Sequence, residues 1–111
     1  MKIGNVTVGQ DGRPILMLAP MAGFSDLTFR GICRQYGAEL TVTEMVSAKA
    51  LYFGDHKTAL PSRLGEGEHP AAVQLFGREP KIMAYAAQKL LSAESPPDII
   101  DINMGCPMPK I

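Results

Sequence analysis

The segment Ile99-Ile-Asp-Ile-Asn-Met-Gly-Cys-Pro107 combines a short apolar run with an amide, a glycine and a thiol directly after it. The run predicts a buried strand, and the residues that follow it predict a loop at the carboxyl end of that strand. Parallel α/β folds place their chemistry at this edge of the sheet. The segment therefore predicts an α/β enzyme with Asn103 and Cys106 in its site.

Outward from this segment, the rest of the chain alternates between strand and helix patterns. Continuous apolar runs predict the strands, and apolar residues three or four positions apart predict the helices. The predicted strands cover residues 15–19, 40–43, 71–76 and 98–103. Helices are predicted from Ser25 to Gly37 and from Pro80 to Ser95, with a short one over 48–53. This alternation implies right-handed crossovers and a parallel sheet.

The local signals give more detailed expectations for the helices and connections. Ser25 is expected to cap the first helix and Gly37 to stop it. The buried apolar side of this helix is predicted to contain Phe29, Ile32, Cys33 and Tyr36. The buried side of the helix that starts at Pro80 is predicted to contain Ile82, Met83, Ala86, Leu90 and Leu91. Residues 1–14 are expected to form a short N-terminal segment with a turn, and 54–70 an irregular connection.

Alternating strand–helix units of this number make up about half of a (β/α)₈ barrel, which typically needs ~250 residues. We therefore predict that the 111 residues form the N-terminal half of a TIM barrel, truncated after the fourth strand. A flavodoxin-like doubly wound sheet is the structural alternative. That fold needs phosphate-binding glycines after the first strand, and Met21-Ala-Gly-Phe24 is not such a pattern.

The composition excludes several classes of protein. A hydrophobic content of 46% excludes a disordered chain, and 11 basic against 11 acidic residues give no global field that would attract nucleic acid or an anionic membrane. No apolar stretch approaches ~18 residues, so we predict no membrane contact. We find no secretory signal and only a weak case for a disulfide between Cys33 and Cys106, and we expect a reducing, cytoplasmic setting. His56 and His69 are far apart in a polar loop, so we expect them to face solvent and predict no metal site.

If the strands are parallel, their carboxyl ends bring amides, a carboxylate, a thiol and a backbone turn to one rim. The candidate site residues are Pro20, Met21, Ala22, Thr43, Glu44, Gln74, Asn103 and Cys106. Asparagine and glutamine each offer a donor and an acceptor, which suits the imide edge of a flavin or a pyrimidine. The apolar turn at Met21 and Ala22 suits the face of a flat ring.

Each polar candidate also has a purely structural alternative. Gln74 could be a satisfied interior polar group, and Asn103 could satisfy the backbone of its own turn. Glu44 could cap the next segment or pair with a lysine, and Cys106 could be a tightly packed loop thiol. Their shared place at the strand ends favours a common site.

Four segments, in this order along the chain, also carry a family resemblance. They are Ala19-Pro-Met-Ala-Gly-Phe-Ser-Asp-Leu-Thr-Phe-Arg30, Thr43-Glu-Met-Val-Ser47, Val73-Gln-Leu-Phe-Gly77, and Asp101-Ile-Asn-Met-Gly-Cys-Pro107 with Lys110. Together they closely resemble the tRNA-dihydrouridine synthases, and the match runs from about Ile15 to Ile111. Other flavin barrels, such as the dihydroorotate dehydrogenases, carry a related Cys-Pro loop without this combination.

The resemblance implies an FMN-dependent (β/α)₈ barrel followed by a small helical domain. It also implies that NADPH reduces FMN, that the flavin gives hydride to C6 of a uridine in tRNA, and that Cys106 then protonates C5. A thiol with an ordinary pKa of about 8.5 is mostly protonated at neutral pH, so it is a competent donor. A strong interaction with Lys110 would favour the thiolate and oppose this role.

The resemblance assigns the other candidates to the two sides of the reaction. It implies cofactor contacts for Pro20, Met21, Ala22 and Gln74. It implies substrate contacts for Asn103 and Glu44.

On this reading, residues 1–111 are part of an FMN-binding TIM-barrel domain, and the remaining barrel strands and the C-terminal helical domain are absent. We expect such a fragment to be inactive alone and to self-associate through exposed sheet edges. Two alternatives remain open. One is another FMN-dependent TIM-barrel reductase acting on a small pyrimidine, and the other is a non-catalytic half-barrel that serves as an oligomerisation module.

Overall fold

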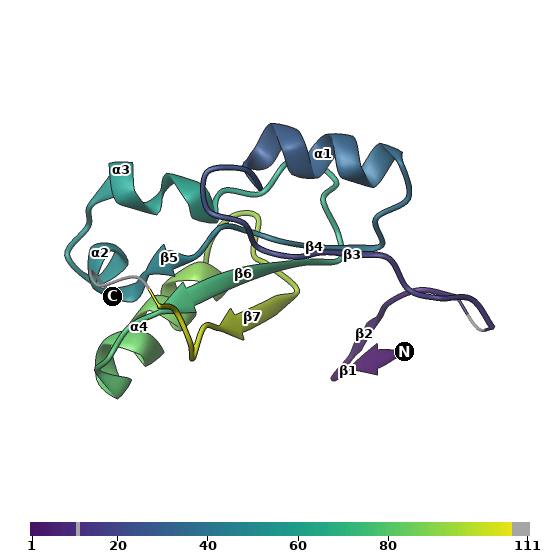
Figure 1. Cartoon of the computed structure of the whole chain (residues 1–111). Helices are drawn as coiled ribbons and strands as arrows, with labels where there is room; N and C mark the ends of the chain where they lie inside the picture. Colours follow the sequence, from purple (N-terminus) through teal and green to yellow (C-terminus); the bar gives the residue numbers. More distant parts are fainter. Residues whose placement is uncertain (11, 108–111) are drawn as a thin grey trace.

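The computed structural model describes residues 1–10 and 12–107, which form a parallel sheet with helices packed around it (Figure 1). The strands are β1 (Lys2–Ile3), β2 (Val6–Thr7), β3 (Met17–Leu18), β4 (Leu40–Val42), β5 (Val46–Ser47), β6 (Ala71–Phe76) and β7 (Ile99–Ile102). The helices are α1 (Leu27–Gln35), α2 (Ala48–Tyr52), α3 (His56–Ala59) and α4 (Pro80–Leu91), with a 3₁₀ helix η1 (Leu60–Ser62).

The strands β3 to β7 form one sheet in which every pairing is parallel. The order is β3-β4-β6-β5, and β7 pairs with β6. Strand β4 pairs with residues 71–72 of β6, β5 pairs with 75–76, and β7 pairs with 72–75. Because β4 and β5 pair with successive parts of β6, they act as one strand that is interrupted at residues 43–45. The predicted α/β class with a parallel sheet is confirmed.

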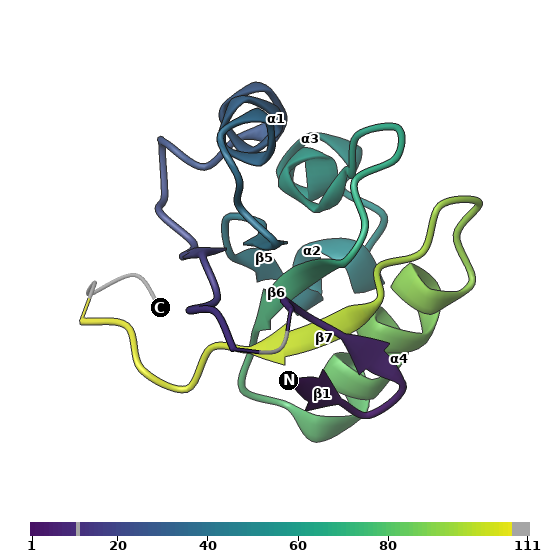
Figure 2. The same cartoon turned by 90° about the vertical axis from the view of Figure 1, so that its right-hand side faces the viewer.

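Side-chain alternation along β6 separates a helix-covered face from the opposite face. Val73 and Leu75 are buried and pack against the helices, whereas Gln74 between them points the other way. The core cluster consists of Val46, Ala48, Leu51, Val73, Leu75, Ala86 and Leu90. Figure 2 shows the helices in an arc around one side of the strands. This arrangement leaves the Gln74 face free for polar side chains.

The strands β6 and β7 both point away from the N-terminal hairpin of β1 and β2 (Figure 1). The loops that follow β3, β5, β6 and β7 therefore meet at one edge of the sheet. This is the edge at which the sequence predicts the site.

Helix α1 begins one residue later than predicted, because Asp26 is its N-cap and not Ser25. The Asp26 carboxylate accepts from the Phe29 N–H over 2.8 Å. The helix ends as predicted at Gly37, whose φ of +106° lies in the left-handed region. The Gly37 N–H donates to the Arg34 carbonyl and the Ala38 N–H donates to the Cys33 carbonyl, which is the Schellman arrangement.

The predicted buried side of α1 is wrong for three of its four residues. Phe29, Ile32 and Tyr36 are exposed, Tyr36 to 86%, whereas Cys33 is half-buried. The fully buried residue of the helix is Arg30. Arg30 faces the sheet because buried hydrogen-bond partners for its guanidinium lie there. The side of α1 that carries most of its large apolar residues therefore faces outward.

The connection after β5 contains more regular structure than predicted. The short helix expected over 48–53 is α2, and the Ser47 hydroxyl caps it by accepting from the Ala50 N–H. Residues 54–70 are not wholly irregular, because they contain α3 and η1. His56 and His69 are exposed, as predicted.

Helix α4 begins at Pro80 as predicted, and Ala86 and Leu90 are buried in the core. Ile82 and Met83 pack against that core. Leu91 is predicted on the buried side, but it is 53% exposed, whereas its neighbour Leu90 in the same turn takes the buried position.

The N-terminal part departs from the prediction at two places. Residues 1–14 contain the antiparallel hairpin of β1 and β2, after which Val8 is buried. The first predicted strand, residues 15–19, is reduced to the two residues of β3 at one edge of the sheet. Met17 is 50% exposed, so this strand is not covered on both faces. Among the described residues, no helix is long and apolar enough to cross a membrane.

Candidate active site

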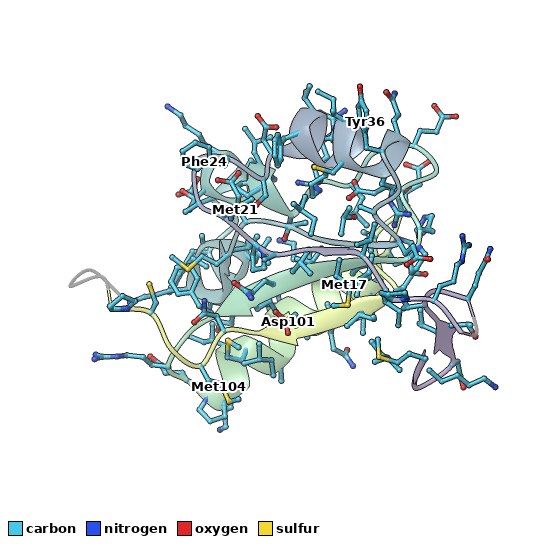
Figure 3. The ribbon with its side chains drawn as sticks, turned by 45° about the vertical axis from the view of Figure 1, so that its right-hand side comes forward. Met17, Met21, Phe24, Tyr36, Asp101 and Met104 are labelled. Carbon is cyan, nitrogen blue, oxygen red and sulfur yellow. The ribbon has the colours of Figure 1, made fainter. Side chains whose placement is uncertain are left out.

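The turn after β3 is held rigidly by its own backbone and by Ser25. The Met21 carbonyl accepts from the N–H groups of Phe24 and Ser25, both over 2.9 Å. The buried Ser25 hydroxyl accepts from the Met21 N–H over 2.8 Å and donates back to the Met21 carbonyl over 3.1 Å. With the backbone fixed in this way, the side chains of Met21 and Phe24 lie at the surface (Figure 3).

Glu44 joins this turn to the interruption between β4 and β5. Its carboxylate accepts a hydrogen bond from the Gly23 N–H. The neighbouring Thr43 is buried, and its hydroxyl accepts from the Gln74 N–H over 3.2 Å and donates to the Glu44 carbonyl over 2.9 Å. The carboxylate therefore lies between the first and second strand ends, as its position in the sequence predicts.

Gln74 and Asn103 form a bonded amide pair at the next two strand ends. The Asn103 amide donates to Gln74 Oε1 over 3.2 Å, and the Gln74 amide donates to Asp101 Oδ2 over 2.6 Å. The Asn103 Oδ1 accepts from the Gly105 N–H over 3.0 Å, which shapes the loop before Cys106. Gln74 and Asp101 are register partners on β6 and β7, and Asn103 lies two residues after Asp101. The three side chains can therefore bond to one another on one face of the sheet.

A cavity of about 700 Å³ opens at the ends of β5, β6 and β7. Its volume is within the range of small-molecule sites, which is roughly 300–1,000 Å³. Its lining residues are Ser47, Lys49, Phe76, Gly77, Arg78, Glu79, Ile82, Ile102, Asn103, Met104, Gly105 and Cys106. Cys106 is a half-buried free thiol, so the cavity brings a thiol and an amide together with the cations of Lys49 and Arg78.

The predicted site residues thus fall into two neighbouring groups at one edge of the sheet. The first is the turn at residues 20–24 with Glu44, and the second is Gln74, Asn103 and Cys106. The Asn103 amide lies 3.8 Å from the sulfur of Met45, next to Glu44, which links the groups. Figure 3 shows Met21 and Met104 at this same end of the molecule.

The cavity itself is lined by only part of the predicted set. Asn103 and Cys106 line it, whereas Gln74, Glu44 and the turn at residues 20–22 lie outside its lining. Lys110, whose distance from the thiol was expected to matter, lies outside the described residues. Among the residues that the structure describes, no cluster of three or more His, Cys, Asp or Glu side chains could hold a metal ion.

Sequence reasoning missed a buried ion pair behind the site. Arg30 is 1% exposed and Glu68 is 5% exposed, and their Nε–Oε2 distance is 2.8 Å. Glu68 also accepts from the Thr41 hydroxyl over 2.7 Å and from the Gly65 N–H over 2.9 Å. The two partners are 38 positions apart, and no spacing signal joins residues at that separation.

The surroundings of Glu68 favour its charged form. Burial alone would raise the pKa of this carboxyl, but hydrogen bonds from Arg30, Gly65 and Thr41 outweigh that effect and hold the pKa below its ordinary value. Arg30 further donates to the carbonyls of Ser25 and Arg63, over 3.0 and 2.7 Å. The pair thereby ties the turn that precedes α1 to β4 and to the segment before β6.

Comparison with known proteins places these features in a family. The sequence model of the dihydrouridine synthase (Dus) family matches residues 17–111. The tRNA-dihydrouridine synthase B of Vibrio parahaemolyticus is 43% identical over an alignment that covers 100% of this chain and 33% of the relative. The corresponding protein of Pseudomonas putida is 41% identical, with 100% of this chain and 31% of the relative covered. The chain spans about a third of the length of these relatives, and the family resemblance read from its four segments is confirmed: the chain belongs to the dihydrouridine synthase family.

Proposed function

We propose that the chain supplies part of an FMN-dependent enzyme that reduces uridine in tRNA to dihydrouridine, with NADPH as the reductant. Membership of the dihydrouridine synthase family supports this reaction, and relatives that cover the whole chain are named tRNA-dihydrouridine synthases. The observation that carries the proposal is the bonded pair of Gln74 and Asn103, which lies directly before the Cys106 loop at the carboxyl edge of the sheet.

The uncommitted polar atoms fit a flavin or another imide-edged ring. A glutamine side chain has two donor hydrogens and two acceptor lone pairs, and Gln74 uses one of each for Asp101 and Asn103. The remaining N–H and lone pair match a neighbouring carbonyl and N–H of such a ring. In the proposal, Gln74 and the apolar turn at residues 20–22 hold FMN, which supplies hydride when bound and reduced.

The substrate base is assigned to Asn103, Glu44 and Cys106. Hydride addition at C6 of uridine builds negative charge on C5 and O4, and a proton must then reach C5. The Cys106 thiol is proposed to deliver that proton from the cavity it lines. Its role requires a protonated and unoxidised sulfur, which supports a reducing, cytoplasmic setting.

The target uridine must leave the base stack of the tRNA to reach a pocket of this kind. Lys49 and Arg78 line the cavity together with Cys106, so they are placed to contact phosphates beside the extruded base. The tRNA partner and the uridine substrate both belong to this proposal.

The proposed place of the chain is the N-terminal half of a (β/α)₈ barrel, with β3, β4/β5, β6 and β7 as its successive strands. The parallel pairing and the helix-covered face support this arrangement. The part of the relatives that the chain does not cover would hold the remaining barrel strands and the helical domain. On this proposal, the 111 residues are inactive without that part.

A second candidate is a non-catalytic half-barrel that acts by self-association. The observation in its favour is that Met17 is exposed on the edge strand β3 and that Ile102 is exposed on β7. A folded dimer of the chain without bound flavin, seen by sedimentation velocity, would favour this candidate over the enzyme.

The Cys106 role is tested in a chimera in which this chain replaces the aligned third of the Vibrio parahaemolyticus relative. We expect the chimera to form dihydrouridine in tRNA with NADPH. Cys106→Ala should lower the rate by at least about 100-fold while FMN absorbance is retained, since a general acid contributes roughly 10²–10⁴-fold.

The matched control is Cys33→Ala, which removes the other free thiol, from α1, and should keep the rate of the unmodified chimera. An equal rate in the Cys106→Ala chimera would show that the thiol is not the proton donor. A flavin-free chimera that folds normally would contradict the assignment of a cofactor site to this chain.

A further inference from the structure

A directed chain of hydrogen bonds runs from the carboxylate of Asp101 to the loop that carries Cys106. The Gln74 Nε2 donates to Asp101 Oδ2 over 2.6 Å. The Asn103 Nδ2 donates to Gln74 Oε1 over 3.2 Å, and the Gly105 N–H donates to Asn103 Oδ1 over 3.0 Å. Each amide therefore donates toward Asp101 and accepts from the side of the loop.

The groups at the two ends of this series of hydrogen bonds decide its direction. An amide side chain can turn either its NH₂ or its oxygen toward a neighbour, but an ionised carboxylate only accepts and a backbone N–H only donates. Asp101 therefore requires the NH₂ of Gln74, which leaves the Gln74 oxygen for Asn103. The same logic turns the Asn103 oxygen toward the Gly105 N–H.

The setting makes this orientation stable. Gln74 is only 8% exposed, so water competes weakly for its amide. Gln74 and Asp101 are register partners on neighbouring strands, which keeps the two side chains in reach without a change in the backbone. The Asn103 N–H also donates to the Leu75 carbonyl over 2.9 Å, so the start of the loop is anchored to the sheet.

We propose that Asp101 is a positioning residue, which sets the orientation of the Gln74 and Asn103 amides and thereby holds the loop that presents Cys106. The role of the thiol in this statement rests on the proposed function, whereas the orientation itself does not. The fixed direction also decides which atoms of Gln74 remain for a ligand, namely one N–H and one lone pair in a defined order. A reversed Gln74 would offer the opposite pattern, so Asp101 acts on ligand specificity through Gln74.

The first test measures hydrogen exchange of the Gly105 amide by NMR in the purified chain. Asp101→Asn keeps the size of the side chain but allows Gln74 to adopt either orientation. We expect Gly105 to exchange about fivefold faster in this variant, the factor that corresponds to weakening one hydrogen bond. The exchange of the Val73 amide in the core serves as an internal reference for global unfolding.

A rescue experiment separates orientation from packing. Gln74→Glu places two carboxylates side by side, and their repulsion should push the side chain at position 74 away from Asn103, so this variant should also speed the exchange of the Gly105 amide. In the double variant Gln74→Glu with Asp101→Asn, the new asparagine can donate to Glu at position 74, which still accepts from Asn103. We expect the Gly105 exchange rate of the double variant to return to within about twofold of the original rate. Deviations of about twofold are usual when the effects of independent mutations are added.

The matched control is Asp98→Asn, the same change on a carboxylate just before β7 that bonds to His69 and to the Ala71 N–H. It should leave the exchange of Gly105 relative to Val73 unchanged. The proposal is overturned if both single variants keep Gly105 within about twofold of the original rate, or if the double variant exchanges as fast as Asp101→Asn alone. Since no flavin or tRNA takes part, this result is independent of the chimera test of Cys106.

Discussion

At the scale of single residues, the buried pair of Arg30 and Glu68 has the largest expected effect on stability. Both side chains are almost fully buried, and each has several hydrogen-bond partners. A buried charge that loses its partner is strongly destabilising, because its desolvation is no longer compensated. The pair is thus expected to be sensitive to the loss of either member.

We predict that Glu68→Gln lowers the free energy of unfolding by about 3 kcal/mol, because it leaves the Arg30 guanidinium without its counter-charge. Urea unfolding followed by circular dichroism measures this change. Glu66→Gln is the matched control, since Glu66 is exposed in the same segment, and it should shift the free energy by less than about 0.5 kcal/mol. A Glu68→Gln protein as stable as the control would contradict the role of the ion pair.

At the scale of elements, α1 shows how a helix can be well formed and yet turn a polar side chain inward. Asp26 caps its start and Gly37 its end. Between them, Gly31 is exposed and has open space around it, so a Cβ would meet nothing within 4 Å. Gly31 inside the helix and Gly37 just after its end therefore have opposite conformational requirements.

We predict that Gly31→Ala raises the free energy of unfolding by about 1 kcal/mol, because alanine has the higher helix propensity and no clash arises. Gly37→Ala should lower it by about 1–2 kcal/mol, because an L side chain at φ +106° is strained. Thermal and urea unfolding of the two variants side by side measures both signs. A destabilised Gly31→Ala variant would show that α1 is limited by tertiary contacts at that position.

At the scale of the whole molecule, two carboxylates link distant parts of the chain to its stability at acidic pH. Glu68 joins α1, β4 and the segment before β6. Asp98 joins the starts of β6 and β7, and although burial alone would raise its pKa, hydrogen bonds from His69 and the Ala71 N–H hold the pKa below the ordinary value. Both groups are therefore more acidic in the folded state than in the unfolded chain.

The sign of the pH dependence follows from these lowered pKa values. The stabilisation from Glu68 and Asp98 is fully present above their ordinary pKa values of 4.5 and 3.8, and it is lost as the pH falls through the lower folded values. We predict a free energy of unfolding that declines below about pH 4.5, with a smaller decline in Glu68→Gln. Urea unfolding at a series of pH values measures it, and an identical decline in the two proteins would contradict the contribution of Glu68.

Much of the architecture follows from local patterns in the sequence. The apolar run at residues 71–76 is short and lies between Pro70 and Gly77, which is typical of a buried strand. Pro80 fixes its own φ at a value that suits the start of a helix, and Gly37 permits the left-handed φ at which a helix ends. The order of strands and helices, and the place of Asn103 and Cys106 after a strand, could therefore be predicted. The family could also be identified, because its motifs are contiguous segments of the chain.

The tertiary structure alone decided which groups became partners. Ser25 is not the cap of α1 because its hydroxyl is bonded to the backbone of Met21. The buried side of α1 was chosen by Glu68, 38 positions away from Arg30, and the orientation of Gln74 by Asp101 across a strand pairing. The sequence by itself determined the helices and strands and the chemical groups available at their ends. Hydrogen bonds between distant segments exist only after the chain has folded. Their energy depends on a distance and an angle between donor and acceptor, and no local sequence pattern sets either.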